Sequence, residues 1–146
     1  MPKLVFPVHV DGLAVDVLIG LDGATTAAQL AAGRPFSPPI RARGEIDTGC
    51  NVTAVSAAIL QRLRVPVQYQ TTTQTAAGTL AVDVFEVSVG IRDFADPMGP
   101  ELVEPTMAVM ELKTTLATVD VLIGLDFLLG CRFVLDGPGR LFSLET

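Results

Sequence analysis

Positive charge and metal-binding side chains are both scarce in this sequence. Lys and Arg number 10 against 16 Asp and Glu, which gives a net charge of −6 at pH 7 and an isoelectric point near 4.6. This balance argues against a nucleic-acid partner, which requires a basic surface. One histidine and two cysteines without metal spacing, Cys50 and Cys131, give no zinc site, so no metal or cofactor is expected. Both thiols are expected to be small buried side chains.

Long apolar runs are missing too. No window reaches the roughly 18 uninterrupted apolar residues of a membrane span, so no membrane partner is expected. The N-terminus has no basic region followed by an apolar core, so the expected location is the cytoplasm. Residues 1–146 are long enough for one domain with its own core. A hydrophobic content of 49% and a mean hydropathy of +0.50 indicate strands buried on both faces or a subunit interface.

The alternation of apolar and turn-forming residues predicts a mostly β chain. Asp11-Gly12, between apolar residues 4–10 and 13–19, is a strong hairpin signal. Residues 23–39, rich in alanine and then proline, are interpreted as a surface loop insertion with one helical turn. Further strands are expected at 40–46, 65–75, 80–91, 106–112, 119–124, 131–135 and 141–144, with short helices at 56–64 and 125–130 and a loop at 93–105.

The strand expected at 40–46 leads directly into Asp47-Thr48-Gly49. An acid at the end of a strand, followed by a small hydroxyl residue and a glycine, is how an aspartic peptidase presents its catalytic carboxylate. Glycine lets the backbone approach the carboxylate closely, and the threonine hydroxyl can hold the loop by a hydrogen bond. The same tripeptide also forms ordinary turns, so its meaning depends on the rest of the chain.

Two later features support the peptidase interpretation. The strands expected at 65–75 and 80–91 meet at the small tip Ala76-Ala77-Gly78-Thr79, which is typical of a mobile β-arm, although an ordinary solvent-facing hairpin is the simpler alternative. An apolar strand then ends in Ile123-Gly124 before a short helix. The eight residues 15–22 recur at 119–126, either as symmetry-related strands or by convergence on a good buried strand.

Taken together, these motifs resemble the retropepsin-type aspartic peptidases, the single-lobed fold of retroviral proteases, and most closely their bacterial relatives. The resemblance covers residues 40–146, and residues 3–20 fit the family's first hairpin. It implies an all-β, single-lobe acid protease barrel with one short C-terminal helix, acting as a homodimer on a peptide or protein substrate. The site that it implies consists of the catalytic Asp47, the loop residues Thr48 and Gly49, the flap residues Ala76, Ala77, Gly78 and Thr79, and the supporting residues Thr53, Ile123 and Gly124.

The resemblance further implies a water activated between two Asp47 carboxylates, one from each chain, with Thr48 bonding across the twofold axis. It places the dimer interface at the terminal segments 2–6 and 141–144. The viral enzymes have an acid and an arginine that pair near the interface, and here these positions are Asn51 and Leu125. The affinity of the dimer therefore does not follow from the resemblance.

Several alternatives stand beside this reading. A catalytically silent peptide-binding or dimerisation module of the same fold is the main rival, because a fold does not imply a reaction. Asp126 is interpreted as a cap at a helix start rather than as a second catalytic acid. His9 is interpreted as a strand side chain rather than a base. A thiol enzyme built on Cys50 is disfavoured, because no base is placed beside it.

Overall fold

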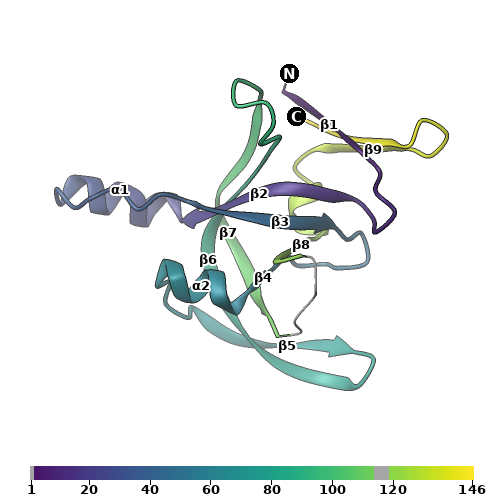
Figure 1. The fold of residues 1–146 in the computed structure, drawn as a ribbon. Helices are drawn as coiled ribbons and strands as arrows, with labels where there is room; N and C mark the ends of the chain where they lie inside the picture. The colour runs from purple at the N-terminus through teal and green to yellow at the C-terminus, as the bar shows by residue number, and fades with distance from the viewer. Residues whose placement is uncertain (1, 114–118) are drawn as a thin grey trace.

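A closed barrel of β-strands forms the centre of the protein (Figure 1). The computed structural model describes residues 2–113 and 119–146. The barrel closes because β6 hydrogen-bonds to β2 as well as to β7, with Val17 opposite Ile91. In sheet order the strands are β2 (Ala14–Leu21), β3 (Ile40–Ile46), β8 (Val121–Ile123), β4 (Ala54–Ser56), β7 (Glu101–Leu112) and β6 (Gly78–Arg92), and β5 (Tyr69–Thr75) adds to the outer edge of β6.

Apolar side chains fill the barrel interior with the period of two that strands impose. In β2, Val15, Val17 and Ile19 are buried, while the residues between them are half-buried. β-branched residues dominate this core because they pack well on a pleated surface. Fully buried side chains come from many strands: Val17, Ile19, Val55, Val87, Val89, Ile91, Val109, Val121 and Ile123.

The two ends of the chain form a second, three-stranded sheet in the order β1 (Lys3–Pro7), β10 (Leu141–Glu145), β9 (Arg132–Asp136). This corrects the predicted first hairpin. The chain does turn at Asp11-Gly12, where His9 and Gly12 form a bridge, but β1 then pairs along its length with β10 instead of β2. The choice follows from packing, because Phe6 stacks on Phe142 at 5.4 Å between ring centroids. The termini consequently lie side by side (Figure 1).

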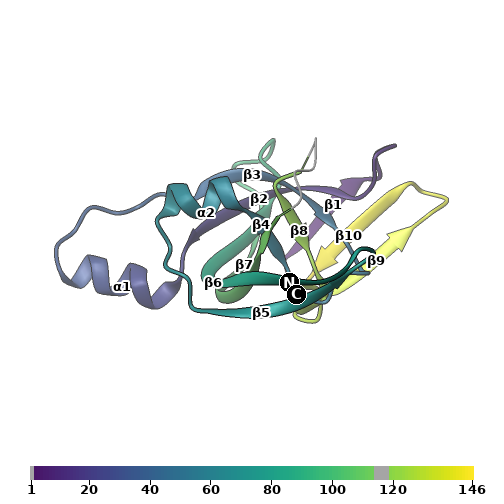
Figure 2. The ribbon, with the colours of Figure 1, turned by 90° about the horizontal axis from the view of Figure 1, so that it is seen from below.

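Within residues 2–113 and 119–146, three short helices accompany the strands, two more than the single C-terminal helix of the predicted fold class. They are α1 (Gly23–Ala31), α2 (Ala57–Leu63) and α3 (Leu125–Leu128). The predicted loop at 23–39 therefore contains a nine-residue helix. It projects from the barrel in both views and buries none of its residues (Figure 2). No helix in the described part of the chain is long and apolar enough to cross a bilayer.

An N-cap explains why α1 forms without a buried face. The Asp22 carboxylate accepts hydrogen bonds from the backbone N–H of Thr25 at 2.9 Å and from its hydroxyl at 2.6 Å. Such caps satisfy the donors that the first helical turn leaves unpaired. Burial raises the pKa of Asp22, but the hydrogen bonds from Thr25 and neighbouring backbone outweigh it, so the pKa lies below its ordinary value.

The other predicted elements agree with the structure to different degrees. β3 has the predicted bounds, and α2 lies within the predicted helix, between Ser56 and Arg64. β7 begins at Glu101, so the predicted loop at 93–105 is too long by its last residues. Pro105 is tolerated inside β7 because the register between β6 and β7 shifts between Val87 and Val89, and such a bulge leaves a strand position unpaired.

The repeated segments lie on either side of the same strand but in different structures. Residues 15–22 form most of β2, which pairs antiparallel with β3, and Asp22 then caps α1. Residues 119–126 contain the short parallel strand β8 and the first turn of α3. Because one copy runs parallel and the other antiparallel to β3, they are not equivalent strands of a symmetric pair.

Candidate active site

The loop that begins at Asp47 is fixed at its first residue by the neighbouring strand. Asp47 follows β3, and its backbone N–H donates to the carbonyl of Ile123 in β8 at 2.9 Å. Its carboxylate is half-buried and accepts a hydrogen bond from the N–H of Gly49 at 3.0 Å. A further bond from the N–H of Cys50 to the Asp47 carbonyl, at 3.1 Å, closes a tight turn. Asp47 is thus held in one place, while Thr48 and Gly49 remain exposed.

The far end of this loop is braced by Thr53, which is completely buried. Its hydroxyl donates to Asp126 Oδ1 at 2.7 Å, and its backbone N–H lies 3.1 and 3.0 Å from the two carboxylate oxygens. The same hydroxyl accepts a bond from the N–H of Gly124 at 3.1 Å. One side chain therefore links the loop to the turn between β8 and α3.

Gly124 is needed here because the two segments touch through their backbones. A Cβ at this position would lie 2.8 Å from the carbonyl oxygen of Cys50 and 3.0 Å from the carbonyl carbon of Val52. Contacts this short require backbone to move, so any larger residue displaces the loop. The sequence prediction that Gly124 and Ile123 support the site stays a prediction about function, with this contact as its physical basis.

Backbone bonds also join the segment 50–51 to the segment 125–126. The N–H of Leu125 donates to the carbonyl of Cys50 at 2.8 Å, and the N–H of Asp126 donates to the carbonyl of Asn51 at 3.2 Å. The N-cap position of α3 is Gly124, which makes no side-chain cap bond. Asp126 Oδ1 accepts a bond from the N–H of Phe127 in the first turn of α3, at 2.8 Å, as predicted for a residue at a helix start, and the same carboxylate also binds Thr53.

The two cysteines are free thiols and are half-buried rather than fully buried. Burial is the main cause that raises the pKa of Cys50, and the carboxylates of Asp47 and Asp126 raise it further. Its Sγ donates to the carbonyl of Val52 at 2.8 Å. The pKa of Cys131 is raised by burial and by Glu104. Both side chains are therefore thiols at neutral pH, which makes Cys50 a poor nucleophile.

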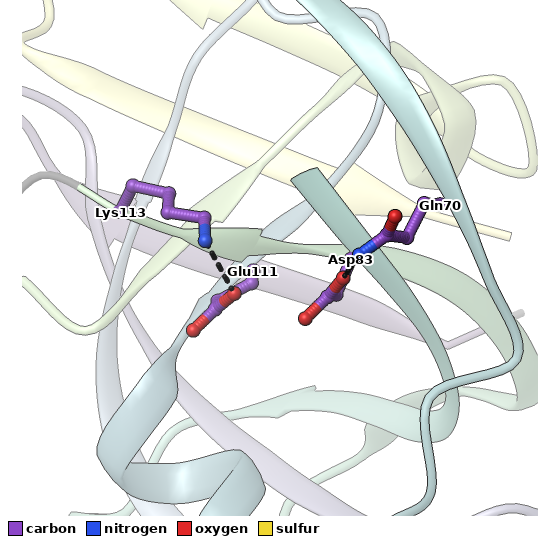
Figure 3. Close-up of polar contacts among 4 residues, drawn as sticks. All are labelled: Gln70, Asp83, Glu111 and Lys113. Carbon is purple, nitrogen blue, oxygen red and sulfur yellow. Dashed lines mark hydrogen bonds and ion pairs between the residues drawn. The ribbon is translucent and has the colours of Figure 1, made fainter. Parts of the chain in front are cut away.

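The hairpin of β5 and β6 carries the predicted flap at its tip. Its strands are joined by cross-strand side-chain bonds, from Gln70 Nε2 to Asp83 Oδ1 at 2.8 Å (Figure 3) and from Gln74 Nε2 to Thr79 Oγ1 at 2.9 Å. Gly78 has φ +119°, a conformation that other residues rarely adopt. Ala76, Ala77, Gly78 and Thr79 are all exposed. Their role over a substrate stays a prediction.

An open cavity of about 550 Å³ lies between this hairpin and the end of the Asp47 loop. Val52 and Asp126 contribute to one wall, and Tyr69 of β5 and Val84 of β6 contribute to another. Near the end of β7, Glu111 Oε2 forms an ion pair with Nζ of Lys113, which follows the strand, at 3.3 Å (Figure 3). Asp47 does not line the cavity, so this space adjoins the loop without containing its carboxylate.

The structure connects five of the ten predicted site residues. Asp47, Gly49, Thr53, Ile123 and Gly124 are connected by hydrogen bonds within the loop and the β8–α3 turn. The contact between Asp126 and Thr53 was not predicted from the sequence. Both are polar residues within mostly apolar segments, and this pattern could have indicated that they pair. In the described residues, no three His, Cys, Asp or Glu side chains are grouped to hold a metal ion.

Comparisons with known proteins agree with this architecture. No protein-family model and no curated protein matches the chain. Its structure is similar to that of a retropepsin-like aspartic protease from Rickettsia conorii, with a TM-score of 0.59 and 18% identity over 97% of this chain and 89% of that chain. For EIAV protease complexed with the inhibitor HBY-793, the TM-score is 0.42 and the identity 21%, over 84% of this chain and 91% of that chain. For the retroviral protease-like domain of Ddi1 from Leishmania major, the TM-score is 0.47 and the identity 13%, over 91% of this chain and 93% of that chain.

The protein therefore has the retropepsin-like fold, with the comparison to the Rickettsia conorii protease as its basis. The closed barrel agrees with the predicted fold class. At 18% identity, this likeness defines an architecture and not a reaction. The reaction has to be argued from the residues of the Asp47 loop.

Proposed function

We propose that this protein is an aspartic endopeptidase whose catalytic carboxylate is Asp47. The observation that carries the proposal is the fixed, half-exposed position of this carboxylate, held from β8 through its own N–H and from Gly49 through Oδ1. A catalytic base must be immobile and still reach its substrate, and this arrangement meets both requirements.

The reaction requires two carboxylates that share one proton. The ionised carboxylate takes a proton from the attacking water, and the protonated one donates a hydrogen bond to the scissile carbonyl. Two adjacent carboxylates lose their protons in separate steps, because both cannot ionise cheaply at short range. Asp126 is a poor second acid, since Thr53 already occupies its oxygens. The second carboxylate is therefore assigned to Asp47 of another copy, in a homodimer with twofold symmetry.

The substrate is proposed to bind in an extended conformation, pairing with the protein like an added strand. The exposed Gly49 leaves room for its backbone, and the hairpin tip 76–79 closes over it. The cavity beside Val52 accepts a side chain of the same peptide. In the dimer, Thr48 bonds to its counterpart across the axis.

The terminal sheet is the proposed interface of this dimer. Its outer face carries Val5 and Val134 in one cross-strand row, exposed by 49% and 38%, and Leu141 in the next row, exposed by 42%. Its two edges, β1 and β9, each have a single strand partner in the described chain. Because β1 is already paired with β10 of its own chain, two copies can associate by joining these edges without exchanging their ends.

Digestion of a diverse peptide library between pH 3 and 8 tests the proposal. The parent protein should cleave with a bell-shaped pH dependence, and a statine-type inhibitor should block it. Asp47→Asn should lose several orders of magnitude in rate. Asp11→Asn, which alters an exposed turn carboxylate, is the matched control and should cleave normally. Cleavage by Asp47→Asn within about tenfold of the parent rate would exclude Asp47 as the base.

Mixing and dilution test the two-chain site. Specific activity should rise with protein concentration, and excess Asp47→Asn chains should poison the parent, because each mixed dimer holds one carboxylate. A monomer in sedimentation that cleaves at full rate would contradict the dimeric site. If library peptides bind to the parent but are never cut, the silent peptide-binding module is the correct function.

A further inference from the structure

A second cavity, of about 780 Å³, lies at the other end of β3 from Asp47. Its walls come from the insertion between β2 and β3 and from the end of α2. Arg41 near the start of β3 lines it, whereas Asp47 follows the end of that strand. A strand rises about 3.3 Å per residue, so the two positions are about 20 Å apart. The cavity is therefore separate from the Asp47 loop.

Four arginines line this cavity: Arg34, Arg41, Arg62 and Arg64. They are four of the chain's 10 basic residues, and no Asp or Glu is among the lining residues. Within the described residues, none of the four forms an ion pair or a side-chain hydrogen bond. The guanidinium carbon of Arg41 lies 4.9 Å from the centroid of the Phe94 ring, which does not line this cavity, so the unpaired charge here comes from Arg34, Arg62 and Arg64. A protein with a net charge of −6 thus concentrates unpaired positive charge at one place.

The backbone around the cavity offers acceptors rather than donors. Both α1 and α2 end there, α2 with Arg64 as its C-cap. The residues after each helix donate to the carbonyls of Ala28, Gln29, Leu30, Leu60 and Gln61, so the acceptors left on the cavity wall are the carbonyls of Arg62 and Leu63 at the end of α2. Three prolines between residues 35 and 39 contribute no N–H. Phosphate sites usually use backbone N–H groups at helix N-termini, which this cavity lacks. Guanidinium groups must therefore supply the binding, and carboxylates match them in bidentate pairs.

An apolar surface accompanies the charge. Phe36 is 60% exposed on the wall of the cavity, and Leu63 of α2 is half-buried beside it. A peptide with acidic and apolar residues meets all these features at once. Its carboxylates pair with the arginines, its N–H groups reach the helix carbonyls, and its apolar side chains cover Phe36.

We propose that the cavity framed by Arg34, Arg41, Arg62 and Arg64 is a docking site for an acidic peptide segment of a partner protein. This site does not depend on the peptidase activity. Charge complementarity decides the occupant, because the remaining surface of the chain is acidic and repels such a segment. The insertion 23–39 then has a use that the barrel alone does not explain.

The test measures binding of a fluorescein-labelled peptide of alternating Glu and Leu to the 146-residue chain with Asp47→Asn, which prevents cleavage of the peptide if the proposed function is correct. The Glu-Leu peptide should bind at least about tenfold more tightly than a matched Gln-Leu peptide, and less tightly as salt rises. Arg34→Gln and Arg62→Gln should each weaken binding about fivefold, and the double variant about 25-fold. Arg43→Gln removes one charge from the same strand as Arg41 but outside the cavity, so it should change binding less than about twofold.

Three results would overturn the proposal. Equal weakening by Arg43→Gln and by Arg62→Gln would mean diffuse attraction without a site. Binding of inorganic tripolyphosphate with the same arginine dependence, and no binding of the Glu-Leu peptide, would define a phosphate site. Binding only to vesicles of phosphatidylcholine and phosphatidylserine would define a lipid-binding surface. Circular dichroism checks that each variant is folded. The binding measurement is repeated with the parent chain, so the docking site can be judged even if the peptidase proposal fails.

Discussion

Replacing Thr53 with valine tests the brace behind the Asp47 loop. Valine has nearly the same shape but no hydroxyl, so Asp126 loses its 2.7 Å donor and the N–H of Gly124 loses its acceptor. A hydrogen bond to a charged group contributes about 1.5–3 kcal/mol, and an unpaired buried N–H costs about 1–3 kcal/mol. Water can partly replace the donor at the half-buried Asp126. The free energy of unfolding should therefore fall by about 3 kcal/mol.

Urea unfolding followed by circular dichroism measures this loss. With an m-value of about 2 kcal/mol/M, a loss of about 3 kcal/mol lowers the midpoint by about 1.5 M. The melting temperature should fall by about 10 °C for a chain of this size. Thr53→Ser keeps the hydroxyl and should recover more than half of the loss. Thr72→Val, on the exposed edge strand β5, is the matched control and should stay within about 0.5 kcal/mol of the parent.

Activity separates the brace from an ordinary core contact. If the hydroxyl positions the loop, the cleavage rate per folded molecule should also fall in Thr53→Val and recover in Thr53→Ser. A loss of stability below about 1 kcal/mol would mean that the network contributes little, and the account of the loop would be wrong. A large loss of stability with full activity would show that Thr53 supports the barrel but not the position of Asp47.

Three further predictions follow from contacts and pKa values. Gly124→Ala should lower the free energy of unfolding, measured with urea, by about 1–3 kcal/mol and reduce cleavage per folded molecule, because the new Cβ meets backbone atoms. Gly137→Ala is the control and should change neither, since no atom lies within 4 Å of a Cβ placed there. Cys50 should be alkylated by iodoacetamide far more slowly than a free cysteine at pH 7, since burial and nearby carboxylates raise its pKa; rapid modification would contradict this. Asp22→Ala should weaken amide-exchange protection in α1 by about 1 kcal/mol at pH 7. Because the folded pKa of Asp22 is depressed, its contribution is present above the unfolded pKa and is lost as the pH falls through the folded value, so parent and variant should converge in acid.

Local signals explain which parts of this fold were predictable from the sequence. The strand before Asp47 and the helix after it were recognisable because each carries its own pattern: alternation up to Ile46, and helix formers from Ala57. The loop itself was recognisable because Asp-Thr-Gly is a contiguous motif. For the same reason, the β5–β6 hairpin was found with its tip nearly in place.

Long-range choices could not be predicted in the same way. Both β2 and β10 were plausible partners for β1, and the packing of Phe6 on Phe142 decides between them. The brief strand β4 exists only because β7 and β8 flank it. The position of Asp126 at the start of a helix indicated its local bond to the N–H of Phe127, but not its contact with Thr53, which is distant in sequence.

The two copies of the eight-residue segment have a consequence for the order in which the chain folds. β3 can accept either copy as a neighbour, and the side chains that enter the core are the same in both. The copy at 15–22 is close in sequence and closes a short loop, so it pairs with β3 early, while the copy at 119–126 must close a much longer one. β2 then occupies one edge of β3 and leaves the other edge for β8. A chain that exchanged them would present Asp22, followed by the α1 insertion, to Thr53. The shorter loop therefore favours the pairing that places Asp126, and not Asp22, beside Thr53.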